Sequence, residues 1–264
     1  MTIVLKIGGS IFNKSASLIN DLKNLDEPFI LVHGGAAEST KLAEELGIET
    51  KTITSPSGFT SRYTTKEQIE VFEMVVAGKI NKTLVIELQK NGINAIGLSG
   101  IDGKLLLAEK KVTRSQENGK IKIIRDDYTG KIEKVNKKLL EMLIENEFVP
   151  VIAPLALSKE NEPLNTDGDR AASIIAQSIN SKKLVLFTDV DGYFRNFPND
   201  FAEELSREEL DECITKATSG MKRKLIAAKE ALENGVKEVI IANGTAEIPI
   251  SNALSGKRTV IRGE

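Results

Sequence analysis

Some residue types are scarce in this sequence, and each scarcity excludes a class of protein. Among 264 residues there is no tryptophan, one cysteine (Cys213) and one histidine (His33). A single cysteine excludes an internal disulfide framework, and one cysteine with one histidine excludes the common zinc sites. We therefore expect a reducing compartment and predict a cytoplasmic protein.

The chain also lacks a strong excess of charge and any long apolar run. It carries 36 Lys and Arg against 38 Asp and Glu, a formal net charge of -2. Nucleic-acid binding needs a basic face, so we predict no nucleic-acid partner. Neither a leader of the basic-then-apolar type nor an uncharged stretch long enough to cross a bilayer is present, so we expect no membrane association.

Apolar runs alternate with amphipathic stretches along most of the chain. The strand-like runs are residues 2–7, 28–33, 93–98, 148–153, 183–188 and 237–242. This alternation predicts an α/β fold, with a parallel sheet covered by helices on both faces. Residues 66–90 have the apolar side of a helix, although Gly78 argues against one straight helix.

One segment breaks the alternation. Residues 104–127 have the pattern of short antiparallel strands around a turn at Asn118-Gly119, which predicts a β-hairpin insertion. Residues 104–138 hold eleven Lys or Arg against five Asp or Glu, whereas residues 200–212 hold seven acids and one arginine. Both are typical of solvated surface, and we predict a surface helix for the acidic segment.

Two pairs of adjacent glycines follow predicted strands. Gly8-Gly9 ends the first strand and Gly34-Gly35 ends the second. In an open α/β sheet, ligands bind beyond the carboxyl ends of the strands, where backbone N–H groups meet anions. Lys6, inside the first strand, adds a positive charge. We therefore predict a phosphate site here, although double glycines also simply end strands.

The familiar phosphate-binding motifs are absent. The sequence has no G-x-x-x-x-G-K-S/T and no G-x-G-x-x-G after a strand, so neither a P-loop nor a dinucleotide fingerprint is available. Another glycine-rich stretch, "GLSGIDG" at 97–103, follows the third predicted strand. It is either a further anion cradle or a tight entry into the hairpin.

Several motifs occur in one order along the chain. They are "KIGGS" (6–10), "VHGGA" (32–36), "NKTLV" (81–85), "GLSGIDG" (97–103), "LNTDGDRAA" (164–172), "FTDVDGYF" (187–194) and "SGMKRKLIAA" (219–228). Over essentially its whole length the chain thereby resembles the amino-acid kinase family, acetylglutamate kinase branch. The resemblance implies a three-layer αβα sandwich of the carbamate kinase type with a mainly parallel central sheet. It also implies an N-terminal lobe (1–180) for the acceptor and dimerisation, and a C-terminal lobe (181–264) for ATP.

The resemblance further implies ATP-dependent phosphorylation of a carboxylate to an acyl phosphate. Lys6 and Lys224 match the family's two transfer lysines, and Asp169 matches the aspartate that holds them. The residues alone also suit a helix-surface lysine at 224 and a helix N-cap at Asp169, a role equally open to Asp167. The amides for the moving phosphate would come from Gly8, Gly9, Gly34 and Gly35.

Acceptor and nucleotide residues are carried over from the same resemblance. Arg62 offers a planar fork for an α-carboxylate, while Asn165 suits either the acceptor or a turn. An ionised carboxylate needs no base, so His33 is expected only to shape the glycine turn. Mg²⁺ is expected to arrive with ATP, and no metal site is assigned to the protein. The candidate ATP contacts are Gly8, Thr188, Asp189, Gly192 and Tyr193.

The acceptor region departs from the usual acetylglutamate kinase pattern. Ala36 replaces a third glycine, and Arg62 lies in "SGFTSRYTTKE". "SRYT" resembles the subgroup that phosphorylates 2-aminoadipate or glutamate while its amino group is attached to a small acidic carrier protein, LysW, in lysine and arginine biosynthesis. The basic hairpin region suits such a partner, although surface solubility explains the same charges. The docking candidates are Lys104, Lys110, Lys111, Arg114, Lys120, Lys122 and Arg125.

Two other functions stay open at this point. One is an N-acetylglutamate kinase that acts on free N-acetyl-L-glutamate. The other is a non-catalytic regulator that binds nucleotides or amino acids, against which the joint presence of Lys6, Asp169 and Lys224 argues. A dehydrogenase is a weaker option. The resemblance also implies a homodimer formed through the N-terminal lobe, to which the helix at 66–90 is expected to contribute.

Overall fold

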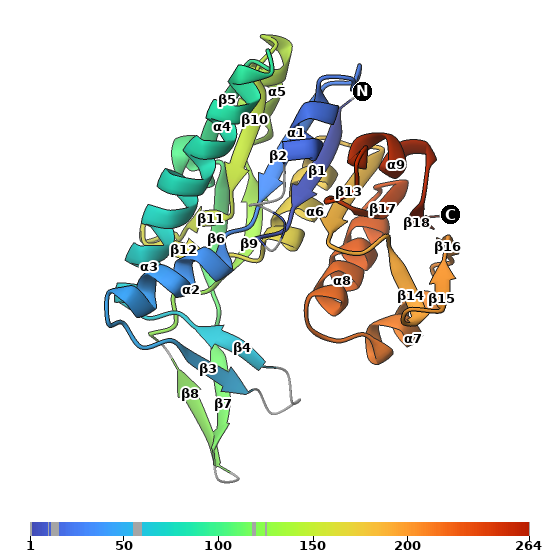
Figure 1. The fold of residues 1–264 in the computed structure, drawn as a ribbon. Coiled ribbons are helices and arrows are strands. Elements are labelled where there is room, and N and C mark those ends of the chain that lie inside the picture. The colour runs from blue at the N-terminus through green and yellow to red at the C-terminus, as the bar shows by residue number, and fades with distance from the viewer. Residues whose placement is uncertain are drawn as a thin grey trace.

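The computed structural model describes residues 2–9, 11, 16–54, 60–117, 120–124 and 126–263. Its centre is an eight-stranded sheet in the order β16-β18-β17-β13-β1-β2-β10-β5 (Figure 1). The strands in that order are Glu204–Leu205, Arg258–Arg262, Glu238–Asn243, Lys183–Thr188, Ile3–Ile7, Phe29–His33, Val149–Ala153 and Ala95–Ser99.

The six runs predicted as strands form the continuous stretch from β17 to β5. Every neighbouring pair among them is parallel. β18 and the short β16 were not predicted, and β18 runs antiparallel to β17. The expected mainly parallel sheet is therefore confirmed.

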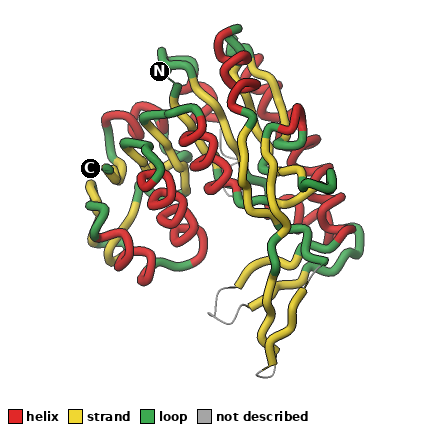
Figure 2. The backbone as a smooth tube through the Cα atoms, turned by 180° about the vertical axis from the view of Figure 1, so that it is seen from behind, coloured by secondary structure: helices red, strands yellow, loops and turns green. Residues whose placement is uncertain are grey.

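Helices cover both faces of this sheet and complete the predicted three-layer αβα sandwich (Figures 1 and 2). One face packs against α5 (Lys137–Glu145), α6 (Gly168–Ser178), α7 (Glu209–Lys216) and α8 (Ser219–Glu233). The other face packs against α1 (Ala16–Leu22), α2 (Ala36–Glu45), α3 (Lys66–Glu73), α4 (Asn81–Lys90) and α9 (Pro249–Ser255). No helix within the described ranges is long and apolar enough to cross a bilayer.

The pleat of β1 decides which layer each of its side chains enters. Ile3, Leu5 and Ile7 belong to the core on the α1, α2 and α9 side, whereas Val4 belongs to the core under α6 and α8. Because side chains alternate along a strand, Lys6 shares the face of Val4. The lysine inside the first strand therefore points toward α6 and α8.

The helix predicted at 66–90 has three consecutive parts. α3 begins with a capping box in which Thr65 and Gln68 satisfy each other's backbone N–H groups, and a π-helical segment, Met74–Ile80, joins it to α4. Gly78 lies inside the π-helical segment, so the predicted irregularity at this glycine is confirmed. π-helical turns are rare and often lie beside functional sites.

The predicted hairpin insertion is also found. β7 (Thr113–Glu117) and β8 (Lys120–Ile124) pair antiparallel, and the predicted turn at Asn118-Gly119 lies outside the described residues. The hairpin of β3 (Lys51–Thr54) and β4 (Thr60–Tyr63) projects from the body beside it (Figures 1 and 2). We call these four strands the twin hairpins.

A second sheet lies at the base of the twin hairpins, in the order β12-β11-β6-β9. These strands are Pro163–Asn165, Leu155–Leu157, Leu106–Lys110 and Gly130–Val135. Part of the predicted hairpin segment, β6, therefore pairs with β9 and β11 and not with β7. A short 3-10 turn at Asp102–Lys104 leads from β5 into this sheet.

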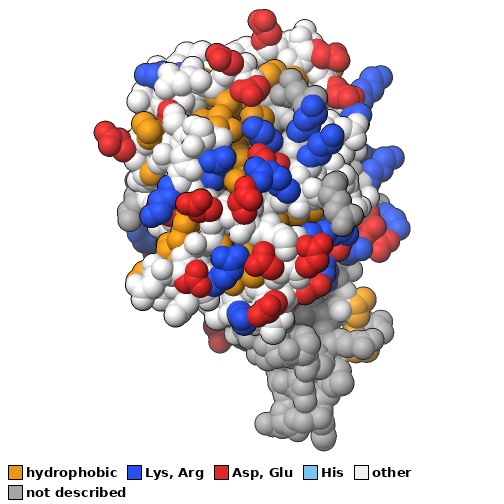
Figure 3. Space-filling model, turned by 90° about the vertical axis from the view of Figure 1, so that its right-hand side faces the viewer, with side chains coloured by type: hydrophobic (Ala, Val, Ile, Leu, Met, Phe, Trp, Pro, Cys, Tyr) orange, Lys and Arg blue, Asp and Glu red, His pale blue; other side chains and the backbone are white. Residues whose placement is uncertain are grey.

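The surface helix predicted over residues 200–212 is wrong for most of that segment. Asp200–Ala202 is a strand, β15, that pairs with β14 (Tyr193–Asn196), and β16 adds to the edge of the main sheet. Helix α7 begins only at Glu209. Ala202 and Leu205 are buried, so pairing of this segment with β14 and β18 outweighs local helix preference. This side of the molecule carries acidic and basic side chains interspersed (Figure 3).

Candidate active site

Three charged side chains from distant parts of the chain meet under the carboxyl end of β1. Lys6 Nζ lies 2.8 Å from Asp169 Oδ1, and Lys224 Nζ lies 3.3 Å from both carboxylate oxygens of Asp169. The three residues are only 5–6% exposed. The predicted pair of lysines held by one aspartate is therefore assembled, and we call it the charged triad.

Local structure explains why each member reaches the triad. Asp167 is the N-cap of α6, and its carboxylate accepts hydrogen bonds from the N–H groups of Asp169 and Arg170, each at 3.0 Å. Asp169, in the first turn of the helix, is thereby left to bind the lysines. A Cβ at Gly168 would lie 3.3 Å from Lys6 Cε, so glycine there leaves room for the Lys6 chain. Of the two roles that the sequence left open for Asp169, the N-cap belongs to Asp167.

The triad holds two ammonium groups against one carboxylate. Burial by itself raises the pKa of the Asp169 carboxyl, but Lys6 and Lys224 outweigh burial and hold that pKa below its usual range. Burial, helped by the neighbouring Lys6, lowers the pKa of the Lys224 amine. Two lysines therefore face one carboxylate in a dry environment, where an incoming phosphoryl group stabilises their charged forms.

The two glycine turns lie directly against each other above the triad. Gly34 N–H donates to Ile7 O at 2.9 Å. A Cβ on Gly34 would lie 3.0 Å from Gly9 N, and a Cβ on Gly9 would lie 3.4 Å from Gly35 N. The two backbones thus approach closely beside Lys6, as expected for a shared anion cradle.

His33, at the end of β2, lies behind the second glycine turn. It is 1% exposed, and its Nδ1 lies 2.9 Å from Gly34 O. Burial lowers the pKa of His33 to about 4, and the nearby Lys6 and Lys82 add to this effect. The prediction that His33 shapes the glycine turn is therefore confirmed.

The stretch "GLSGIDG" forms a tight turn. Asp102 accepts hydrogen bonds from Ser99 N at 2.6 Å and from Ser99 Oγ at 2.8 Å. A Cβ at Gly100 would lie 1.9 Å from Leu155 O, so the chain passes too close to β11 for any side chain. Of the two possibilities left open by the sequence, the structure favours a tight entry into the second sheet.

The acceptor candidates lie at the base of the twin hairpins. Asn165 Nδ2 donates to Thr64 Oγ1 at 3.3 Å, and Asn165 N donates to Tyr128 O at 2.8 Å. Arg62 lies on β4 opposite Thr52, but its side chain is outside what the structure describes. The Thr64 N–H donates to the buried Asp127 carboxylate at 3.1 Å, which ties the first hairpin to the body.

Of the nucleotide candidates, Gly8 lies in the first glycine turn after β1, and the other four lie at and after the end of β13. Thr188 is 9% exposed and donates to Asp189, whose side chain faces solvent. The Tyr193 side chain lies in the core beside Cys213, where burial and a hydrogen bond to Cys213 raise its pKa to about 12. A contact between Tyr193 and ATP, as predicted, would therefore have to use the main chain.

Gly192 is required by its surroundings. A Cβ there would lie 2.4 Å from Thr259 Oγ1, the same oxygen that accepts from Tyr193 N at 2.7 Å. Asp191, next to Gly192, accepts from Lys257 Nζ at 2.7 Å and from Asn243 Nδ2 at 3.0 Å. Our reading of the sequence missed Lys257 and Asn243, because nothing local marks side chains at the ends of two other strands as neighbours of this loop.

The described carrier-docking candidates are solvent-accessible. Lys104 and Lys111 are exposed, and the Lys110 ammonium lies 3.8 Å from the centre of the Tyr128 ring and 3.3 Å from Glu162. The side chains of Arg114, Lys120 and Lys122, all on the second hairpin, and the whole of Arg125 lie outside the described residues.

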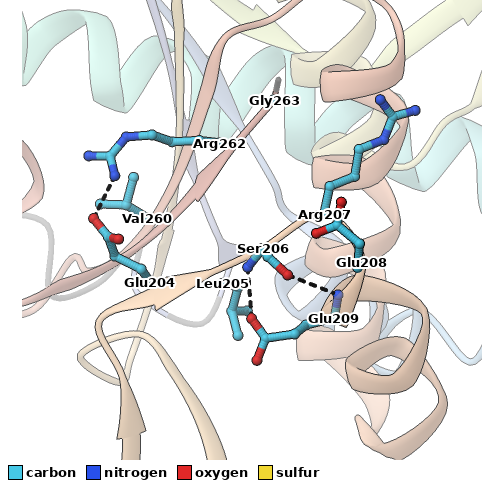
Figure 4. Close-up of a pocket in the computed structure, with 9 residues that line it drawn as sticks. All are labelled: Glu204, Leu205, Ser206, Arg207, Glu208, Glu209, Val260, Arg262 and Gly263. Atoms are coloured by element: carbon cyan, nitrogen blue, oxygen red, sulfur yellow. Dashed lines mark hydrogen bonds and ion pairs between the residues drawn. The ribbon is translucent and has the colours of Figure 1, made fainter.

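A pocket of about 420 Å³ lies away from all of these residues. It is lined by β16, β18 and the start of α7, where Arg262 pairs with Glu204, and Ser206 and Glu209 bond to each other (Figure 4). Arg262 is in register with Glu238, the first residue of β17, so this pocket is at the amino ends of the parallel strands. Lys6 and Thr188 lie near the carboxyl ends, and the pocket contains no predicted site residue.

Within the part of the chain that the structure describes, no three His, Cys, Asp or Glu side chains gather as a metal site would require. The donors near the triad are ammonium groups and backbone N–H groups, which bind anions. The fold and this donor set together define an α/β phosphoryl-transfer enzyme of the type that binds its substrate phosphates through lysines and glycine turns.

Comparison with known proteins identifies the family. The profile of the amino acid kinase family matches residues 1–243, so the chain belongs to that family and is a kinase. LysW-aminoadipate kinase of Thermus thermophilus is 42% identical, and the match covers 98% of this chain and 100% of that protein. LysW-aminoadipate/LysW-glutamate kinase of Saccharolobus islandicus is 43% identical, with 98% of each chain covered. The resemblance predicted from the motifs is confirmed.

Solved structures confirm the fold. N-acetylglutamate synthase of Neisseria gonorrhoeae superposes with a TM-score of 0.81 at 25% identity over 100% of this chain, which spans 59% of that protein. A carbamate kinase from Giardia superposes with a TM-score of 0.72 at 15% identity, over 100% of this chain and 99% of that one. The expected carbamate kinase type of architecture is thus found.

Proposed function

We propose that this kinase transfers the γ-phosphoryl group of ATP to the side-chain carboxylate of 2-aminoadipate or glutamate whose amino group is linked to a LysW-type carrier protein. The product is an acyl phosphate, as required in lysine and arginine biosynthesis. The observation that carries this proposal is the buried charged triad beside two glycine turns. The names of full-length relatives at 42% and 43% identity support the carrier-linked acceptor.

The transfer step needs charge neutralisation and alignment more than covalent chemistry. A carboxylate oxygen of the acceptor forms a bond to the γ-phosphorus while the bond from that phosphorus to the bridging oxygen of ATP breaks, and the electron pair leaves with ADP. Lys6 and Lys224 approach from β1 and α8 and neutralise phosphoryl oxygens. Asp169 keeps both ammonium groups in place between turnovers.

No general base is required, because the acceptor carboxylate is ionised at neutral pH. This agrees with the position of His33, which is buried and neutral and contacts the backbone. Mg²⁺ bound to the ATP phosphates supplies further charge neutralisation. Gly8, Gly9, Gly34 and Gly35 supply N–H groups, whereas Arg62 and Asn165 hold the acceptor.

The twin hairpins are proposed as the carrier-docking surface. They project from the body, and Lys111, which lies between β6 and β7 at their base, is exposed. Lys104, at the other end of β6, is exposed as well. Val112 and Ile123 are 71% and 51% exposed, although both are large apolar residues. Exposed apolar groups in a segment rich in basic residues suit a small acidic protein, because opposite potentials steer the encounter and apolar contacts hold the complex.

The remaining organisation is proposed from the family. ATP binds the C-terminal lobe (181–264) and the acceptor binds the N-terminal lobe (1–180), with the boundary in the connection between α6 and β13. The two lobes share the main sheet through β1 and β13. A homodimer forms through the N-terminal lobe, where Met74 and Ile86 of the long helix are 55% and 53% exposed. The single cysteine supports a cytoplasmic location.

Trapping of the acyl phosphate with hydroxylamine tests the proposal. Carrier-linked aminoadipate, carrier-linked glutamate and free N-acetyl-L-glutamate are compared as acceptors at equal ATP. We expect hydroxamate only from a carrier-linked acceptor, and none in a Lys6→Met variant prepared identically. Efficient turnover of free N-acetylglutamate would overturn the carrier-linked acceptor, and ATP binding without turnover of any acceptor would favour a regulator.

A further inference from the structure

Asn81 is a buried polar residue that the chemistry described above does not use. It is the first residue of α4, where the π-helical segment ends, and it is 0% exposed. Its Nδ2 donates to Val151 O at 2.9 Å and to Leu98 O at 3.3 Å, and lies 3.2 Å from His33 Nε2. Its Oδ1 accepts from Lys82 Nζ at 3.0 Å. Three of these partners lie on other elements (β2, β5 and β10), and the fourth lies on α4 itself. The buried amide therefore has one favoured orientation of its oxygen and nitrogen.

The partners of Asn81 determine where the proton of His33 lies. An ammonium group only donates, so Oδ1 faces Lys82; carbonyl oxygens only accept, so Nδ2 faces Val151 and Leu98. The two hydrogens of Nδ2 are shared among these two carbonyl oxygens and His33 Nε2. Because an amide nitrogen accepts no hydrogen bond, a proton on Nε2 would point at Nδ2 without a partner, so Nε2 is the unprotonated nitrogen. A neutral imidazole that accepts at Nε2 carries its proton on Nδ1, which then donates to Gly34 O at 2.9 Å.

The hydrogen bond to Gly34 O sets the direction of a peptide in the anion cradle. In a planar trans peptide the C=O and the following N–H point in opposite directions. With its C=O held against the His33 ring, the Gly34–Gly35 peptide directs the Gly35 N–H away from that ring. The Gly35 nitrogen lies on the side of the first glycine turn, 3.4 Å from the place of a Cβ on Gly9.

We propose that Asn81 is a positioning residue for phosphoryl transfer: it fixes the Nδ1–H tautomer of His33 and thereby aims the Gly35 N–H into the phosphate cradle. This inference rests on the proposed function, since it assigns a purpose to the same cradle. It also explains the small residue at Gly97, where a Cβ would lie 2.0 Å from Asn81 Oδ1. The low pKa of His33, about 4, keeps the ring neutral at working pH.

The tautomer can be measured directly, because His33 is the only histidine of the chain. Long-range ¹H–¹⁵N spectra of protein labelled at histidine distinguish a protonated Nδ1 from a protonated Nε2. We expect the wild type at pH 7 to show protonated Nδ1 and bare Nε2. In Asn81→Asp the carboxylate accepts where the amide donated, so we expect Nε2 to become protonated. A wild-type Nε2–H tautomer would overturn the proposal.

Kinetics test whether the tautomer matters for transfer. We expect Asn81→Asp to lower kcat by about 100-fold, the scale of a misplaced reacting group, while KM for ATP changes little. Asn91→Asp is the matched control, because it makes the same substitution at the other end of α4, where Asn91 bonds Glu87 O. We expect this control to leave both the His33 spectrum and kcat unchanged.

A second background separates positioning from general damage to the core. His33→Asn keeps a donor near the position of Nδ1 but removes the nitrogen that meets Asn81. In that background we expect Asn81→Asp to have no further effect on kcat. An equal loss in both backgrounds would mean that Asn81 acts on the fold alone and would overturn the proposal. The expected tautomer in a protein that turns over no acceptor would instead overturn the proposed function, because the spectrum does not depend on activity.

Discussion

The charged triad and the twin hairpins differ most in their exposure to water, and we propose that they serve two different tasks of one enzyme. The triad draws Lys6, Asp169 and Lys224 from a strand and two helices into a site that is only 5–6% exposed. The twin hairpins are two-stranded ribbons that project into solvent, with Lys51 and Ile123 exposed on them and Lys111 exposed just before β7. Charge acts strongly where water is excluded, whereas recognition of a protein partner needs an accessible surface. If carrier docking lies on the twin hairpins as proposed, phosphoryl transfer and docking can be disturbed separately.

The largest expected effect comes from removing a triad lysine. Lys6→Met and Lys224→Met should each lower kcat by about 10²–10³-fold, the cost of losing one group that stabilises transition-state charge. KM for the carrier-linked acceptor should change much less, because docking is proposed to lie on the twin hairpins. Steady-state kinetics with varied acceptor measure both, with far-UV circular dichroism as the control for folding. A variant that raised only the acceptor KM would contradict the separation of the two regions.

The buried neutral His33 should make stability fall with acid. Its pKa is about 4 in the folded chain against 6.5 when unfolded. Because the folded pKa is the lower one, the unfolded state binds the proton first, and stability is lost as pH falls from 6.5 toward 4. The loss should reach about 3 kcal/mol, at 1.36 kcal/mol per pKa unit.

Urea unfolding at several pH values measures this effect. His33→Asn has no titrating side chain at this position, so its stability should fall less between pH 6.5 and 4 than that of the wild type. The same acid-dependent loss in both proteins would show that other groups cause it.

The close approach of the two glycine turns should make one added methyl group costly. A Cβ on Gly34 meets Gly9 N at 3.0 Å, so Gly34→Ala must separate the two turns, and we expect kcat to fall by roughly 10–100-fold. Gly78→Ala is the control, because a Cβ there meets nothing within 4 Å. In a helix this change should raise stability by about 0.5–1 kcal/mol. Equal kinetic losses in the two variants would rule out close packing as the cause.

The smallest expected effect comes from the docking charges. Lys104→Gln with Lys111→Gln should raise KM for the carrier-linked acceptor about 3–10-fold with kcat unchanged, since an exposed ion pair contributes no more than about 1 kcal/mol. High salt should reduce the difference. Lys90→Gln with Lys216→Gln removes two exposed lysines from α4 and α7 and should leave KM unchanged. A fall in kcat with unchanged KM would contradict a docking role.

Sequence patterns predicted the secondary structure correctly where it depends mainly on residues close by in the chain. Six apolar runs became six parallel strands, and an Asn-Gly dipeptide between alternating residues marked the hairpin of β7 and β8. The helix predicted for residues 200–212 was wrong, because β15 and β16 form by pairing with β14 and β18, which lie outside that segment.

For the site, the motifs located the residues but not their partners. Lys6 and the glycine turns followed from strand ends alone, whereas Lys224 and Asp169 each had an ordinary structural reading. For Asp169 the other reading was a helix N-cap, a role that Asp167 fills. For Lys224 it was a helix-surface lysine, which only the packing of α6 against β1 and α8 excluded. Asn81 lies in the motif "NKTLV", but the sequence suggested no role for it, because its contact is with a histidine 48 positions away.

The sequence by itself determined the parallel sheet, the glycine turns at its carboxyl edge and the lysine that faces one layer, since each follows from periodicity or from a short motif. Tertiary structure alone decided that one aspartate binds two lysines, that the Tyr193 side chain belongs to the core, and that Asn81 lies against His33. The reason is physical: hydrogen bonds and ion pairs in a dry interior act over about 3 Å, and residues far apart in the chain come within that distance only after the layers have packed.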